Sequence, residues 1–219
     1  MLASNRSERK RIVIVGAGMG GLTALRRLEE LDVHKIADIT IVEKNTTFTV
    51  PACWQYALTD RDTYEHVMWP LPEGEDDVVV MEDTTVEKLN TRSSVLSLME
   101  PGRSRHTQLR YDYLIIACGI STNRQALLGL SQYTFDYTDL AHIIPLRDRL
   151  YSIKTGEVVV VVCKKAYKCP PIPYEVAFLV DMLLRARKVR DAVGIKVVIP
   201  YDSLLDSKVG EDVFMSQME

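Results

Sequence analysis

The sequence predicts an α/β fold: a doubly wound parallel sheet with a small antiparallel meander, followed by a partial second unit of the same kind. Three observations lead to this class. Short, apolar, β-branched runs recur along the chain, as in parallel strands that are buried on both faces. Segments with helical periodicity alternate with these runs. A glycine-rich turn at residues 16–21 directly follows the first run.

The first elements are a strand, a turn, a helix and a second strand. Residues 11–15 (R-I-V-I-V) predict the first strand, and the glycine turn comes directly after it. A helix is expected over residues 19–32, because leucines recur there on one stripe while charged residues lie largely outside it. The second strand is expected over residues 38–42 (D-I-T-I-V) and leads into Glu43.

Gly16, Gly18 and Gly21 give the turn the G-x-G-x-x-G spacing, and Gly20 lies within it. In this motif the first glycine makes the turn, the second lets a pyrophosphate approach the backbone, and the third lets the helix pack on the strand. The helix N-terminus directs partial positive charge at the phosphates. Glu43 stands where a carboxylate can accept hydrogen bonds from a ribose diol. We therefore expect a Rossmann-like dinucleotide site in this region.

The middle of the chain is expected to hold an irregular segment, two more strands, the meander and a helix. In order, we expect an aromatic-rich irregular segment over 51–72, a strand over 78–81, antiparallel strands over 84–88 and 94–98 with a turn at residues 101–102, a buried strand over 109–119, a loop over 121–132, and a helix over 139–151 that Pro145 should bend or break.

The second unit begins near Thr155 with the five valines 158–162, which predict a strand buried on both faces. A loop with cysteines and prolines but no glycine follows, and then a helix from Pro173 to about Val189 and a strand over 194–200. Without glycine, this loop lacks the usual means of closing backbone N–H groups on a pyrophosphate. We expect a dinucleotide-binding domain over 1–150, which the resemblance described below implies to be FAD-binding, and a partial second dinucleotide-binding-like domain over 151–219.

Composition excludes several classes of function. The chain has 219 residues, 47% of them hydrophobic, and a formal net charge of −3, so it can bury a core and gives no signal for binding nucleic acid. The four cysteines show neither a disulfide framework nor zinc-ligand spacing, and we expect no metal. We see no signal peptide and no transmembrane segment. These features favour the cytoplasm or an organelle matrix and are compatible with peripheral membrane attachment.

Three motifs carry a resemblance to a known family: V-I-V-G-A-G-M-G-G, Y-D-Y-L-I-I-A-C-G and K-C-P-P-I-P-Y-E. Together they resemble the flavoproteins that oxidise sulfide, namely the sulfide:quinone oxidoreductases and the flavoprotein subunit of flavocytochrome c sulfide dehydrogenase. These are pyridine nucleotide-disulfide oxidoreductase-like proteins. The first motif is common to many flavoproteins, and the second, with Ala117 and Gly119, is also widespread. The third, C-x-x-x-P-Y-E, is the specific one.

The resemblance implies an activity and a site. FAD would lie with its pyrophosphate on the glycine turn and its ribose on Glu43, and Pro51 belongs to a loop (T-F-T-V-P-A) placed beside the flavin ring. Cys169 would be one of two redox cysteines whose disulfide is attacked by sulfide or a small thiol, which leaves a persulfide. Glu175 would act as an acid or base. Electrons would pass through FAD to a quinone or a cytochrome.

The chain also departs from that family pattern. The family's later G-D motif and its second redox cysteine have no counterpart before Glu219. We expect a partner chain or a second copy to supply the missing half, or a truncated, non-catalytic chain that binds FAD or a partner. A second alternative is an NAD(P)H-dependent flavin oxidoreductase of the type II NADH dehydrogenase kind. Cys163 is a further candidate for pairing with Cys169, although both it and Cys118 are expected to be small buried residues.

Overall fold

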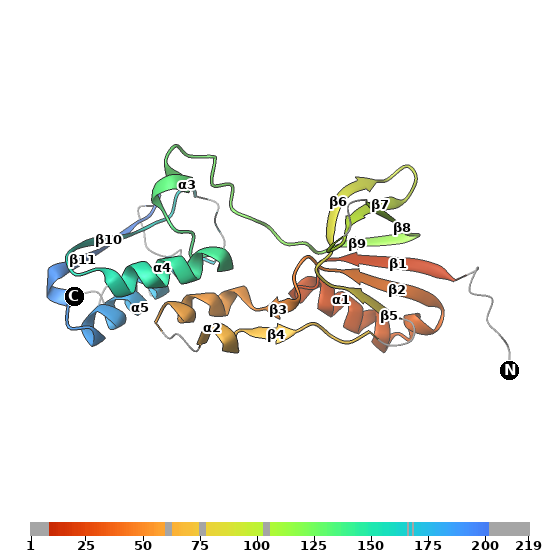
Figure 1. Cartoon of the computed structure of the whole chain (residues 1–219), viewed down its shortest axis with the longest axis horizontal. Coiled ribbons are helices and arrows are strands. Elements are labelled where there is room, and N and C mark those ends of the chain that lie inside the picture. The colour runs from red at the N-terminus through yellow and green to blue at the C-terminus, as the bar shows by residue number, and fades with distance from the viewer. Residues whose placement is uncertain are drawn as a thin grey trace. The chain divides into compact units, whose positions relative to one another are not determined.

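The computed structural model describes residues 9–59, 63–74, 78–102, 106–165, 167 and 169–201. By their contacts, these residues form two compact units (Figure 1). The first comprises the chain up to Val50 together with Glu65–Ser121, and the second comprises Pro51–Tyr64 together with the chain from Thr122 onward. This contact-based division differs from the one expected at residue 150, because the described residues of 51–64 and 122–150 also belong to the second unit. The assignment of functions to domains 1–150 and 151–219 stays a prediction.

A four-stranded parallel sheet forms the centre of the first unit, in the order β5-β2-β1-β9. Its strands are β1 (Lys10–Val15), β2 (Ala37–Val42), β5 (Val78–Met81) and β9 (Tyr113–Ile116). In register, Ile14 of β1 lies between Ile41 of β2 and Ile115 of β9. The α/β fold class with a parallel sheet is therefore confirmed, and β5 has the predicted bounds.

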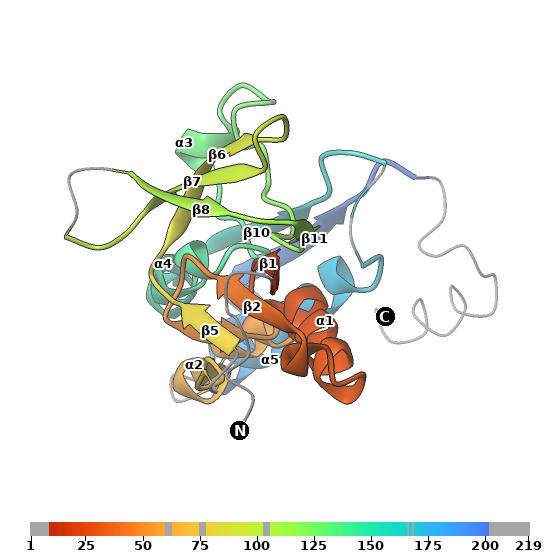
Figure 2. The same ribbon diagram turned by 90° about the vertical axis from the view of Figure 1, so that its right-hand side faces the viewer.

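Two different layers cover this sheet (Figure 2). On one face lies α1 (Met19–Glu30), followed by the 3-10 turn η2 (Val33–Lys35), and Leu25 of α1 packs with the strand isoleucines Ile12, Ile14, Ile39 and Ile41. On the other face lies the antiparallel meander of β6 (Thr85–Asn90), β7 (Val95–Met99) and β8 (Thr107–Arg110). Its Leu96 and Leu98 pack against Val13 and Val42 of the parallel sheet.

The single buried strand expected over 109–119 is wrong. The chain forms β8 up to Arg110, leaves the meander, and begins β9 only at Tyr113. Asp112 marks the change, because its carboxylate accepts hydrogen bonds from the backbone N–H of Arg11 at 2.8 Å and from the Arg11 guanidinium at 3.1 Å. This pairing joins the start of β9 to β1 and prevents the antiparallel ladder from continuing.

The segment expected to be irregular, residues 51–72, contains three short elements: the 3-10 helix η3 (Pro51–Leu58), α2 (Thr63–His66) and β4 (Met68–Pro70). The strand β3 (Thr47–Thr49) directly precedes this segment and pairs antiparallel with β4. The rings of Phe48 in β3 and Trp69 in β4 lie 5.9 Å apart, and this aromatic pair stabilises a small ribbon in the first unit.

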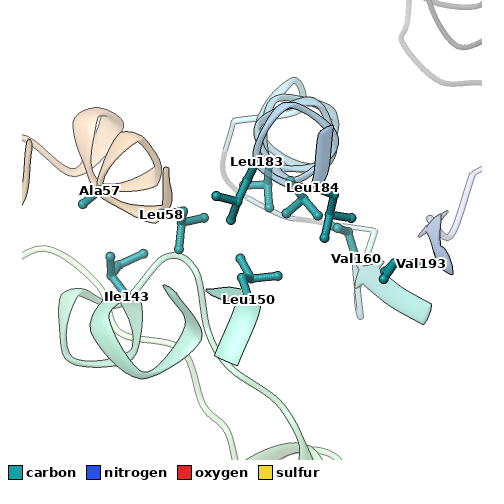
Figure 3. Close-up of a cluster of buried hydrophobic side chains, with 10 residues drawn as sticks. Ala57, Leu58, Ile143, Leu150, Val160, Leu183, Leu184 and Val193 are labelled. Atoms are coloured by element: carbon teal, nitrogen blue, oxygen red, sulfur yellow. The ribbon is translucent and has the colours of Figure 1, made fainter. Parts of the chain in front are cut away.

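The second unit packs helices on a two-stranded parallel sheet. Its elements are α3 (Leu130–Tyr133), α4 (Leu140–Ser152), β10 (Gly156–Val161), α5 (Ile172–Ala186), the 3-10 turn η4 (Arg190–Ala192) and β11 (Val193–Val198). Figure 3 shows its core, where Leu58 of η3, Ile143 and Leu150 of α4, and Leu184 of α5 point toward one another, with Val160 of β10 beside them. Burying these side chains supplies the main stabilisation of the unit.

Two expectations for this unit need correction: the burial of the valine strand, and a break of the helix at Pro145. The valine strand is buried on one face only: Val160 is 5% exposed, whereas Val159 is 47% and Val161 is 44% exposed, because helices cover a single face of the sheet in the described part of the chain. Pro145 does not break α4. It lies on the exposed side of the helix, where water can satisfy the carbonyl that loses its partner, while Ile143 and Leu150 hold the opposite side in the core.

Candidate functional site

The glycines of the turn between β1 and α1 have different surroundings. Two of them are closely packed against backbone atoms, and a third faces open space. Gly16 has φ +99°, and a Cβ there would lie 2.5 Å from the carbonyl oxygen of Ala117. A Cβ at Gly21 would lie 1.8 Å from the carbonyl oxygen of Gly16. Gly18 is the N-cap of α1, and a Cβ there would meet nothing within 4 Å. A ligand therefore has room above Gly18, while Gly16 and Gly21 are required by the fold itself.

Glu43 lies against this turn. Its Oε2 accepts a hydrogen bond from the backbone N–H of Ala17 at 2.7 Å, and its Oε1 accepts two from Asn45, at 3.0 Å from the backbone and 2.8 Å from the side chain. Each carboxylate oxygen has two lone pairs, so the group can still accept a hydrogen bond from a ribose hydroxyl. The structure thus brings together the acid and the glycines that the sequence predicted as one site.

Ala117 and Gly119 complete this part of the site. The Ala117 N–H donates to the carbonyl oxygen of Val15 at 2.8 Å, and the Ala117 side chain lies 3.7 Å from the position of a Cβ on Gly20. Gly119 follows with φ +70°, a conformation that favours glycine. The segment after β9 therefore borders the glycine turn.

These residues fit a dinucleotide pyrophosphate. Helix α1 has no acidic residue in its first turn, and its N-cap has no side chain to cover the first N–H groups. Such N–H groups have no partner within a helix, and together with the helix dipole they favour an anion. The glycine turn would hold the pyrophosphate of FAD, and Glu43 would bind its ribose.

Cys169 lies in the second unit, in the loop between β10 and α5. It is exposed, and its φ of 56° lies in the left-handed region, which costs a non-glycine residue roughly 1–2 kcal/mol. Its carbonyl oxygen accepts a hydrogen bond from the N–H of Ile172, the first residue of α5, at 3.2 Å. Cys169 therefore lies directly before the N-terminus of α5, with its side chain exposed.

The N-terminus of α5 differs chemically from that of α1. The N–H groups of Tyr174 and Glu175 both donate to the carbonyl oxygen of Pro171, each at 3.1 Å. Pro173 has no N–H, and the N–H of Ile172 is bound by the Cys169 carbonyl. The first turn of α5 therefore has no N–H left for a phosphate, and the loop before it has no glycine.

Glu175 has a partner that the sequence analysis did not identify. The side-chain amide of Gln55 in η3 donates to its Oε2 at 2.6 Å, and Gln55 is only 4% exposed. A buried amide is costly unless it is hydrogen-bonded, so this contact fixes both groups. The two residues lie 120 positions apart in sequence, and no local pattern could have revealed the pair.

The expectation that Cys118 and Cys163 are buried is wrong, since both are exposed, while Cys53 is half-buried. Tyr137 lies near Cys163. Burial raises the pKa of Tyr137 to about 12, with smaller contributions from the charges of Asp136, Tyr167 and Cys163. The Tyr137 hydroxyl is therefore protonated at neutral pH. No disulfide joins these four cysteines in the structure.

The predicted site residues thus fall into two groups. The dinucleotide group lies in the first unit and comprises Gly16, Gly18, Gly20, Gly21, Glu43, Ala117 and Gly119. The sulfur group, Cys169 and Glu175, lies in the second unit, which also holds Pro51, the first residue of η3 and a predicted cofactor-binding residue. Among the residues that the structure describes, no three His, Cys, Asp or Glu side chains gather as a metal site. Within the same residues, no helix is long and apolar enough to cross a bilayer.

A parallel sheet with a glycine turn at an open helix N-terminus and an acid after the second strand defines a dinucleotide-binding α/β protein. The chain belongs to the pyridine nucleotide-disulphide oxidoreductase family, whose model matches residues 10–162. A second model, for the central region of the flavoprotein chain of flavocytochrome c sulfide dehydrogenase, matches residues 144–217. FAD is the cofactor of this family, as the family resemblance implied.

Relatives of two kinds match the sequence. The mitochondrial sulfide:quinone oxidoreductase of Dictyostelium discoideum is 26% identical over 212 residues, which cover 88% of this chain and 44% of that protein. A type II NADH:quinone oxidoreductase of Staphylococcus haemolyticus is 24% identical over 135 residues, which cover 61% of this chain and 32% of that protein. The chain therefore spans less than half the length of these relatives.

Solved structures share the fold. The sulfide:quinone oxidoreductase of Aquifex aeolicus superposes with a TM-score of 0.81 at 17% identity, over 95% of this chain and 48% of that one. NDH2 of Plasmodium falciparum in complex with NADH superposes with a TM-score of 0.77 at 16% identity, over 96% and 46%. The matches to sulfide-oxidising flavoproteins confirm the family resemblance that the sequence motifs indicated.

Proposed function

We propose that this chain takes part in the oxidation of sulfide or a small thiol, with Cys169 as the sulfur-handling residue and a quinone or cytochrome as the final electron acceptor. The observation that carries this proposal lies in the loop between β10 and α5. This loop carries the exposed Cys169 directly before α5, and the first turn of that helix has no N–H group free for a dinucleotide phosphate.

Each residue of the sulfur group has a definite task in this proposal. A thiolate at Cys169 would be a strong nucleophile, and forming a persulfide from it and sulfide requires two electrons to pass to the bound cofactor. Glu175 would accept or donate a proton through Oε1, because Oε2 is held by Gln55. Gln55 would thus keep the carboxylate in one orientation.

The first unit would hold the cofactor. Gly16, Gly18, Gly20 and Gly21 would surround the FAD pyrophosphate, and Glu43 would bind the adenosine ribose. Ala117 and Gly119 would border the remainder of the molecule, and Pro51 of the second unit is proposed as a further cofactor-binding residue. When bound, FAD supplies a two-electron acceptor for sulfur chemistry and returns electrons to an external acceptor. The match covers less than half of either relative, and a partner chain or a second copy that adds contacts belongs to this proposal.

The second candidate is an NAD(P)H-dependent flavin oxidoreductase. It is favoured by the match to a type II NADH:quinone oxidoreductase and by the fold shared with NDH2. It is disfavoured by the glycine-free loop at residues 162–171 and by the occupied N–H groups at the start of α5. A nicotinamide dinucleotide would find no phosphate cradle there.

The two candidates are separated by the electron donor that reduces the flavin. The purified full-length chain is loaded with FAD, and its visible spectrum is recorded anaerobically before and after the addition of sulfide, and in a parallel sample of NADH. We expect sulfide to bleach the flavin bands and NADH to leave them unchanged. Bleaching by NADH alone would establish the second candidate. A chain that takes up no FAD would exclude both activities and leave the truncated, partner-binding alternative.

A further inference from the structure

The outer face of the meander in the first unit carries hydrogen-bond donors and cations, and the nearby carboxylate of Glu87, at the strand irregularity before Lys88, lies 3.4 Å from His106. The strand register places Lys88 of β6 opposite Ser97 of β7, and Ser97 opposite Gln108 of β8. It likewise places Asn90 and Arg110 on either side of Val95. Residues opposite one another share a face, and this face looks away from the apolar one that packs on the parallel sheet.

A hollow of about 710 Å³ lies over this face, and Lys88, Arg92 and Arg110 are its charged lining residues. All three are exposed, and within the described residues the structure gives none of them an ion pair or a side-chain hydrogen bond. Ser97, Gln108 and the turn residues Asn90–Ser93 supply the remaining polar lining. Three like charges therefore surround one hollow in a chain whose formal net charge is −3.

A second, smaller hollow of about 340 Å³ adjoins the first, since Ser93 and Arg110 line both. It adds the cations of Lys10 and Arg11 and one carboxylate, Asp112. Arg11 and Asp112 pair with one another, and hydrogen bonds from Arg11 lower the pKa of Asp112 to about 2. This pair cancels its own charge, so Lys10 and Arg110 leave the joined surface positive.

We propose that this face, called here the meander cation face and defined by Lys88, Arg92, Arg110 and Lys10, binds ligands that carry clustered phosphate groups. Arginine and lysine side chains with free donors are the usual partners of phosphate oxygens. The face is shallow and extended, which suits several phosphates presented together. This inference is independent of the sulfide proposal, because none of these residues belongs to the dinucleotide group or the sulfur group.

The expected affinity for clustered phosphates has a physical basis: a polyanion relieves the mutual repulsion of the cations on this face. Cations that surround one hollow repel each other unless counterions screen them, and a multivalent anion replaces several counterions at once. Binding should therefore weaken steeply as salt rises. A charge reversal on this face removes one attraction and adds one repulsion to every phosphate nearby.

The test uses inorganic tripolyphosphate and the full-length chain, with binding measured by calorimetry at low and at physiological ionic strength. Lys88→Glu and Arg110→Glu are compared with the parent, and Lys154→Glu serves as the matched control, because Lys154 is exposed and belongs to the second unit. Lys88→Glu and Lys154→Glu change the net charge of the chain by the same amount. Far-UV circular dichroism establishes that each variant is folded.

We expect tripolyphosphate to bind the parent, with a dissociation constant that rises about tenfold or more in Lys88→Glu and Arg110→Glu and less than about twofold in Lys154→Glu. Vesicles of phosphatidylcholine with and without phosphatidic acid identify the source of the phosphate. Binding only to vesicles that contain phosphatidic acid, lost in the same variants, assigns a lipid headgroup and upholds the site. The proposal is overturned if the parent binds neither tripolyphosphate nor the vesicles. It is also overturned if Lys154→Glu loses as much affinity as Lys88→Glu and Arg110→Glu.

Discussion

At the scale of single residues, the glycine turn separates positions required by the fold from a position that leaves room for a ligand. Gly21 and Gly16 face backbone atoms that cannot move aside, whereas Gly18 faces open space at the N-cap of α1. The same motif therefore contains both structural and ligand-binding glycines. A substitution at Gly21 should consequently act mainly on stability, and one at Gly18 mainly on FAD affinity.

Gly21→Ala should lower the free energy of unfolding by roughly 3 kcal/mol, because its Cβ would lie 1.8 Å from the Gly16 carbonyl oxygen and the backbone must shift. Gly18→Ala should cost no more than about 1 kcal/mol, the usual loss at an N-cap, but should weaken FAD binding at least tenfold. Urea unfolding measures the first effect, and a titration with FAD followed by flavin fluorescence measures the second. Equal stabilities for the two variants would contradict this account of the turn.

At the scale of elements, α5 is held at both ends by contacts that the sequence did not reveal. Gln55 of η3 binds Glu175 in the first turn of α5, and Asp181 further along accepts hydrogen bonds from Arg185 and Arg190. Arg190 also donates to the carbonyl oxygen of Val193 at 2.9 Å, which ties η4 to the start of β11. These contacts fix the helix that presents the sulfur group.

The Asp181 contacts predict a pH dependence of stability. Burial is the largest single influence and raises the pKa of Asp181, but the hydrogen bonds and charges of Arg185 and Arg190 together lower it below 3.8. A lowered pKa in the folded state stabilises the fold above about pH 4, and this contribution is lost as the pH falls through the folded-state value. Asp181→Asn should therefore lower the free energy of unfolding at pH 7 by roughly 0.5–1 kcal/mol.

The measurement is urea unfolding of the parent and of Asp181→Asn at a series of pH values from neutral to about 2.5. The difference between the two proteins should shrink as Asp181 of the parent becomes protonated. A difference that stays constant across the whole range would show that the carboxylate charge contributes nothing, and would contradict this explanation.

The sequence predicted those elements that are determined by local pattern. The strand at 78–81 and the strand–turn–helix unit around Gly16 are set by apolar runs and glycine spacing, which act over a few residues. It mispredicted 109–119, because the break at Asp112 depends on Arg11, which lies 101 positions away. The sequence also did not predict that Pro145 lies on the exposed side of α4 or that Gln55 donates a hydrogen bond to Glu175, since both depend on tertiary packing.

At the scale of the whole molecule, the candidate site is distributed over two compact units. One carries the dinucleotide group and the other carries Cys169, Glu175 and Pro51. Each unit has its own apolar core, so each can keep the geometry of its group by itself. The proposed chemistry requires that sulfur bound at Cys169 and FAD bound at the glycine turn act together, and this cooperation is the central claim about function.

The most direct test of that claim is to map persulfide by mass spectrometry after anaerobic sulfide is added to the FAD-loaded chain. Parent, Cys169→Ser and Cys163→Ser proteins are compared, with the flavin spectrum recorded on the same samples. We predict persulfide on Cys169 in the parent and in Cys163→Ser, and loss of both the persulfide and the flavin bleaching in Cys169→Ser. Flavin bleaching by sulfide that persists in Cys169→Ser, with no persulfide on Cys169 of the parent, would contradict the account.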